Sequence, residues 1–168
     1  RDLHVRTRRQ RQMCIRDRAK DARDLQADPE FRAGDEANIL LRKNHSALGA
    51  FDKADRPKAL DLLGFTSQLV FTTTALSNYG LEHSGDIGLA LETARAHNRM
   101  MVDFCSVDAR LLGTGYVPLA DIEAAPRIAT EAINMGCKAL VIPSRCPSEH
   151  SPSPVSYTHL TLPTTPYV

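Results

Sequence analysis

The sequence of 168 residues contains no tryptophan, and only 5% of its residues are aromatic. No apolar run approaches the roughly 18 residues that a membrane-spanning helix needs, so we expect no contact with a membrane. The arginine-rich start is not followed by the apolar core of a secretory signal. The four cysteines form no CxxC pair and lack zinc-finger spacing, which predicts reduced thiols in a cytoplasmic protein.

The usual catalytic motifs are also missing. The six histidines form neither HxH nor HExxH, and no G-x-S-x-G elbow surrounds Ser144. Gly113-Thr114-Gly115 lacks the third glycine and the following helix of a dinucleotide-binding loop, so we interpret these glycines as sites of close packing. No two carboxylates are spaced for acid–base catalysis.

Charge is distributed unevenly along the chain. Residues 1–18 hold seven arginines against two aspartates, a net charge of +5, and since the total is +1 the other 150 residues carry −4. A basic arm of this kind is typical of nucleic-acid binding. One hypothesis is therefore a small α/β binding module whose N-terminal arm contacts nucleic acid.

Both ends differ from the middle of the chain. Residues 12–18 and 154–168 resemble translated sequencing-adaptor read-through, and the C-terminal stretch carries no acidic or basic side chain other than His159. We interpret residues 1–18 as an artefactual arm and 154–168 as an artefactual tail, and exclude them from functional reasoning as one excludes tags. Residues 19–153 are then the predicted folded domain, and nucleic acid is not an expected partner.

The middle of the chain repeats a helix followed by an apolar, strand-like run. The predicted helix–strand pairs are 56–64 with 68–74, 86–107 with 111–119, and 121–135 with 138–145. A further helix is predicted from Asp28-Pro29 to about residue 48. Alternation of helices with apolar strands predicts a parallel sheet covered by helices. The predicted fold class is α/β, a partial (β/α)8 TIM barrel of about three βα units, and a complete small doubly wound sheet is the alternative.

Substrate-pocket candidates follow from this topology, because parallel sheets build their sites where the strands end. Threonine hydroxyls after the first strand can donate hydrogen bonds, although threonine also favours strands for reasons unrelated to chemistry. Arg145 could hold a substrate carboxylate or pair with Glu149. The candidates are Thr72, Thr73, Thr74, Pro118, Ser144, Arg145 and His150.

Several segments together resemble one family, the amidohydrolase-related (amidohydrolase 2) metal-dependent hydrolases. They are LGAF (48–51) with DRP (55–57), LGF (63–65) with QLVF (68–71), NR (98–99) with DFCSVDARLLG (103–113), YVPLAD (116–121), GCKAL (136–140), IPSR (142–145) and SPS (151–153). The similarity covers about residues 28–153. Each motif is short, and the order and spacing of all of them carry the resemblance.

The resemblance implies a TIM barrel that binds one divalent metal, often zinc, and takes a small-molecule substrate. Members hydrolyse C–O, C–N or C–C bonds or decarboxylate carboxylic acids, using a metal-activated water or a metal-polarised substrate. Their ligands are an HxH pair, a later His and an Asp, and none of these can be matched here. We therefore assign no catalytic or metal residue, and expect an internal fragment that is inactive and metal-free by itself.

Overall fold

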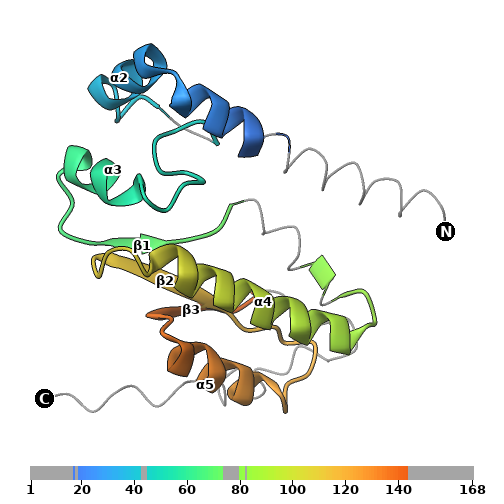
Figure 1. Ribbon diagram of the computed structural model, residues 1–168. Helices are drawn as coiled ribbons and strands as arrows, with labels where there is room; N and C mark the ends of the chain where they lie inside the picture. The colour runs from blue at the N-terminus through green and yellow to red at the C-terminus, as the bar shows by residue number, and fades with distance from the viewer. Residues whose placement is uncertain (1–16, 18, 43–44, 74–79, 82, 144–168) are drawn as a thin grey trace, which may run out of the picture. The chain divides into compact units, whose positions relative to one another are not determined.

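The computed structural model describes residues 17, 19–42, 45–73, 80, 81 and 83–143 of the chain (Figure 1). The chain divides into two compact units, Arg1–Val70 with Phe104–Leu112, and Phe71–Asp103 with Gly113–Val168. Both adaptor-like ends lie outside the described residues, apart from residue 17. The assignment of residues 1–18 and 154–168 therefore stays a prediction.

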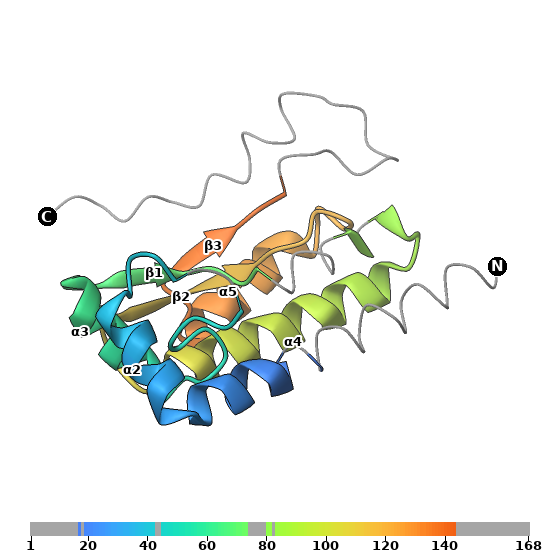
Figure 2. The same ribbon diagram turned by 90° about the horizontal axis from the view of Figure 1, so that it is seen from above.

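The first unit begins with a helix over residues 19–27, which leads into α2 (Pro29–Ala37) (Figure 2). The predicted start of α2 is confirmed, because the Asp28 carboxylate accepts a hydrogen bond from the Glu30 N–H at 2.9 Å. The predicted extension to residue 48 is wrong. Asn38 ends the helix, and its side-chain Nδ2 donates to the carbonyl of Gly34 at 2.9 Å. Asparagine competes in this way with helical backbone bonding.

Helix α3 (Arg56–Leu63) belongs to the same unit and begins and ends where the sequence predicts. Pro57 lies in its first turn, and Gly64 ends it with a φ of +70°, in the left-handed region. Asp55 precedes Arg56-Pro57 as Asp28 precedes Pro29, which favours the same capping role, but its side chain makes no capping hydrogen bond. Its carboxylate instead accepts two hydrogen bonds from Arg32.

The next two helices are α4 (Ile87–Cys105) and α5 (Ala125–Met135). The Asp86 carboxylate accepts from the Leu89 N–H at 2.9 Å and so caps α4 as predicted. Helix α5 begins four residues later than the predicted 121, with Pro126 in its first turn, and ends at Gly136 with a φ of +119°.

The strands are β1 (Gln68–Val70), β2 (Leu111–Tyr116) and β3 (Ala139–Val141), all shorter than predicted. They form a three-stranded parallel sheet in the order β1-β2-β3. In the β2–β3 register, Thr114, Gly115 and Tyr116 lie opposite Ala139, Leu140 and Val141. The α/β class with parallel strands is thereby confirmed.

The core of the second unit lies where α4 and α5 pack against β2 and β3 (Figure 1). Its buried members are Ala94, Tyr116, Val117, Leu119, Ala125, Ile128 and Ala129. Gly115 explains the close fit, since a Cβ there would lie 3.1 Å from the Cβ of Ala132 and 3.1 Å from the sulfur of Cys137. The packing role predicted for the glycines of β2 is confirmed at this position.

None of the helices in the described part of the chain has the length and apolar character required to cross a bilayer.

Candidate functional site

Three of the predicted pocket residues are described. Thr72 and Thr73 follow β1, and Pro118 follows β2. The Thr72 hydroxyl oxygen is buried and has no hydrogen-bond partner among the described residues, Thr73 is exposed, and Pro118 is fully buried. The other four, Thr74, Ser144, Arg145 and His150, lie outside the described residues.

Asn98 of α4 holds the carboxyl end of β2. Its side chain is fully buried, its Nδ2 donates to the Tyr116 carbonyl oxygen at 3.1 Å, and its Oδ1 accepts from the Tyr116 N–H at 2.6 Å. One amide side chain therefore supplies both partners that a neighbouring strand would give this residue. The segment leading to Pro118 is fixed to α4 by this pair of bonds.

His97, next to Asn98 on α4, is also buried, at 7% exposure. Its ring lies edge-on to the ring of Tyr116, with 6.3 Å between centroids and an angle of 72°. Burial lowers the pKa of His97, and a hydrogen bond with the backbone of Thr114 opposes that effect in part. Burial inside the second unit therefore disfavours the protonated imidazole relative to that of an exposed histidine.

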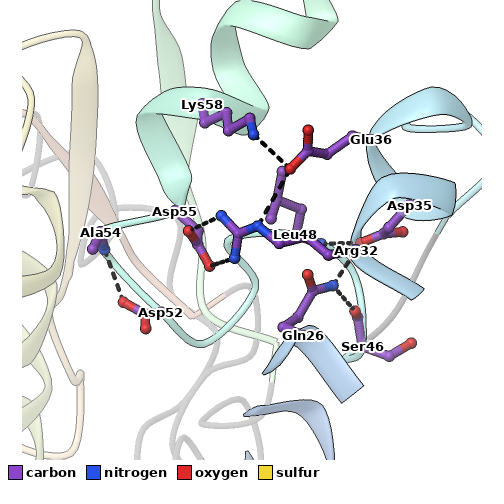
Figure 3. A network of polar contacts seen from close by, with 10 residues as sticks. All are labelled: Gln26, Arg32, Asp35, Glu36, Ser46, Leu48, Asp52, Ala54, Asp55 and Lys58. Carbon is purple, nitrogen blue, oxygen red and sulfur yellow. Dashed lines mark hydrogen bonds and ion pairs between the residues drawn. The ribbon is translucent and has the colours of Figure 1, made fainter. Parts of the chain in front are cut away.

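A polar network in the first unit centres on Asp35 of α2, whose side chain is fully buried (Figure 3). One carboxylate oxygen accepts from Gln26 Nε2 at 2.6 Å and from the Leu48 N–H at 2.8 Å, and the other lies 3.4 Å from Arg42 Nε. Gln26 Nε2 also donates to the Ser46 carbonyl at 2.8 Å. The two helices and the loop after them are joined through these side chains.

A second group of charges lies beside it, between α2 and α3 (Figure 3). Arg32 donates from Nη1 and Nη2 to the two oxygens of Asp55, at 3.1 and 2.6 Å, and its Nε lies 3.3 Å from Glu36. Lys58 donates to the same Glu36 carboxylate. The hydrogen bond with Asp55 raises the pKa of Arg32, and the one with Lys58 lowers the pKa of Glu36. These four charges therefore neutralise one another.

A cavity of about 240 Å³ lies in the same unit. It is bounded by the helix over residues 19–27, by Arg32 and by residues of the segment 45–55. The lining residues are Ala22, Arg23, Gln26, Ala27, Arg32, His45, Ala47, Gly49, Ala50, Phe51, Asp52 and Asp55. Sequence reasoning did not find this cavity.

The described side chains offer no cluster of metal ligands. Within the described ranges, no three or more His, Cys, Asp or Glu side chains gather closely enough to hold an ion. The two described cysteines, Cys105 and Cys137, are buried and are not joined by a disulfide. Burial raises the pKa of the Cys137 thiol, which disfavours the thiolate that metal ligation requires. The described residues thus do not fit the divalent metal that the family resemblance implies.

Sequence reasoning missed Asp35 and Asn98, the two buried polar residues with the most specific roles. A signal for Asn98 exists, since an asparagine on the apolar face of an amphipathic helix must find hydrogen-bond partners in the core. Asp35 has no such signal, because the sequence of α2 places it among other charged residues, Glu30, Arg32 and Glu36.

Comparisons of the chain with protein-family models, with curated proteins and with solved structures return no match. The resemblance to the amidohydrolase-related family therefore remains an inference from the sequence.

Proposed function

We propose that residues 19–153 form part of the (β/α)8 barrel of a metal-dependent hydrolase or decarboxylase related to the amidohydrolase 2 family. The proposal treats the chain as an internal portion of a longer cytoplasmic enzyme with a small-molecule substrate. The observation that carries it is the run β2–α5–β3, two parallel strands joined by a helix, which follows another strand and helix in the same order. This repetition is the building unit of such barrels.

In this proposal the ends of the parallel strands contribute to the wall of the substrate pocket. Thr72 is the described residue that supports this role best, because its hydroxyl is buried and has no partner among the described residues. A buried hydroxyl in that state costs about 1–3 kcal/mol, a cost that a substrate acceptor would remove. Arg145 would bind a substrate carboxylate, and Thr73, Thr74, Pro118, Ser144 and His150 would line the same edge.

The described residues do not supply ligands for the metal of the proposed enzyme. In enzymes of this class a bound metal activates water or polarises the substrate. The contribution proposed for the present residues is limited to binding and orienting the substrate. For the chain of 168 residues alone, we expect no stoichiometric zinc, and tight binding of one zinc per chain would contradict the proposed division of roles.

The decisive experiment uses the uninterrupted reading frame from the source DNA. The proposal expects an HxH before residue 19 and a strand carrying His after residue 153, and a frame without either overturns it. In the enzyme that this frame encodes, Thr72→Val should raise KM severalfold, since the loss of one hydrogen bond to the substrate is worth about 0.5–1.5 kcal/mol.

Thr130→Val provides the matched control, because the exposed Thr130 hydroxyl bonds only to the carbonyl of Pro126 within α5. If Thr72→Val and Thr130→Val have equal KM values, Thr72 does not contact the substrate.

A further inference from the structure

The cavity of the first unit has walls that are fixed in place from several sides. Besides the bonds from Asp35 to Leu48 and from Gln26 to Ser46, the Gly49 carbonyl accepts from Arg56 Nη1 at 3.3 Å. Gly49 itself has a φ of +70°, and a Cβ there would lie 2.7 Å from the Cα of Arg56. The backbone over residues 46–49 is thus held by side chains on several sides, which favours a wall of fixed shape beside the cavity.

Part of the lining of this cavity is apolar. Four alanines and one phenylalanine contribute to it, and Phe51 is partly buried. The alanines are Ala22, Ala27, Ala47 and Ala50. Side chains this small leave room for a branched aliphatic group, which would bury its surface against Phe51.

The lining also includes four charged side chains. Arg32 and Asp55 neutralise each other through their two hydrogen bonds. Arg23 and Asp52 are the other charged lining residues, both are exposed, and neither has an ion-pair partner among the described residues. The Asp52 carboxylate accepts one hydrogen bond, from the Ala54 N–H at 2.9 Å, which leaves its second oxygen for a ligand.

We propose that this cavity binds a small zwitterion with an apolar body, of the class of free apolar α-amino acids. The ligand carboxylate would face Arg23, its ammonium group would face Asp52, and its aliphatic group would occupy the space between the alanines and Phe51. Guanidinium–carboxylate and ammonium–carboxylate contacts are the complements of these two charges. The site is independent of the proposed barrel pocket, which lies at the ends of the strands.

The test is an NMR titration of the ¹⁵N-labelled chain with leucine and two analogues, each lacking one charge. For a ligand of this size we expect a Kd of about 1 mM for leucine, with shift changes confined to residues 22–27 and 45–55. Both 4-methylpentanoate, which lacks the ammonium group, and 3-methylbutylamine, which lacks the carboxylate, should bind at least about fivefold more weakly.

Two variants assign the charges. Arg23→Gln should weaken the binding of leucine and of 4-methylpentanoate at least about fivefold and leave the Kd of 3-methylbutylamine unchanged. Asp52→Asn should weaken the binding of leucine and of 3-methylbutylamine by a similar factor and leave the Kd of 4-methylpentanoate unchanged. Arg127→Gln, an equal loss of charge on the exposed face of α5, should leave every Kd unchanged. Far-ultraviolet circular dichroism verifies that each variant is folded.

Three results would overturn the proposal: no saturable shift up to about 20 mM leucine, equal affinity for all three ligands, or shift changes centred outside the cavity. The comparison among the three ligands needs no variant, so the proposal remains testable even if a substitution disturbs folding.

Discussion

Replacing Asn98 with leucine should destabilise the protein far more than any exposed substitution on the same helix. Leucine has the same branched skeleton of side-chain heavy atoms as asparagine but cannot hydrogen-bond, so the Tyr116 N–H and carbonyl each lose the partner that Asn98 provides at 2.6 and 3.1 Å. Asn98 is fully buried, which means that water cannot replace the lost bonds without opening the core.

The magnitude follows from those two groups. A buried polar group that loses its partner costs about 1–3 kcal/mol, so the pair costs about 2–6 kcal/mol. Burial of the leucine side chain in place of the amide returns about 1 kcal/mol. A net loss of a few kcal/mol is a large part of the roughly 5–15 kcal/mol that stabilises a typical domain.

A second substitution at the same position separates hydrogen bonding from packing. Asn98→Asp keeps the acceptor for the Tyr116 N–H but places a carboxylate oxygen against the Tyr116 carbonyl. Burial raises the pKa of the introduced carboxyl above its ordinary value of about 3.9. The unfolded chain then ionises before the folded one as pH rises, so this variant should be most stable below about pH 4 and lose stability above it.

The assay is urea unfolding followed by circular dichroism, at several pH values for the aspartate variant. Asn134, exposed on α5, provides the control, and its leucine and aspartate variants should each stay within about 0.5 kcal/mol of the parent. If Asn98→Leu also stays within that range, the bonds to Tyr116 do not hold the end of β2. A pH-independent loss in Asn98→Asp would likewise refute the reasoning.

The remaining predictions concern packing, protonation and the open sheet edge. Gly115→Ala should lower the free energy of unfolding, measured in urea, by about 1–3 kcal/mol, because the added Cβ would lie 3.1–3.2 Å from side-chain atoms. Gly88→Ala in α4 is the control: the nearest atom to its Cβ is 3.6 Å away, so this variant should be more stable by up to about 1 kcal/mol. Because burial lowers the pKa of His97, stability should be complete above about pH 6.5 and fall as the pH drops below it, and His97→Phe should remove this dependence between pH 7 and 5. Leu69→Lys on β1, which lies at one end of the strand order, should reduce self-association in light scattering more than Leu89→Lys on α4, although both leucines are 42% exposed.

The ends of helices were predictable where a single glycine or proline determines the local backbone conformation. Gly64 and Gly136 adopt the left-handed backbone that glycine tolerates best, and Pro57 and Pro126 lie in first turns, where a missing N–H costs nothing. The length of α2 was not predictable in the same way, because its weak apolar pattern continues past Asn38, where the helix ends.

Strand ends were less predictable, because an apolar run reports burial rather than strand pairing. The run after β2 shows the difference. Val117, Pro118 and Leu119 are almost fully buried, yet β2 ends at Tyr116. Burial selects apolar side chains at these positions whether or not their backbone continues the sheet.

The contacts that organise both candidate sites connect residues far apart in the chain, and this is why local patterns could not reveal them. Asp55 has the sequence context of a helix cap, but its partner, Arg32, lies 23 residues earlier and binds both carboxylate oxygens. A bidentate ionic contact outweighs a single bond to a backbone N–H, so the long-range partner prevails over the local one. Asn98 and Tyr116 are separated by 18 residues, and their pairing depends on how α4 returns to β2. The hydrogen-bond partner of a buried polar residue depends on how the elements pack. A sequence can therefore indicate that a polar residue lies in the core without indicating which residue it binds.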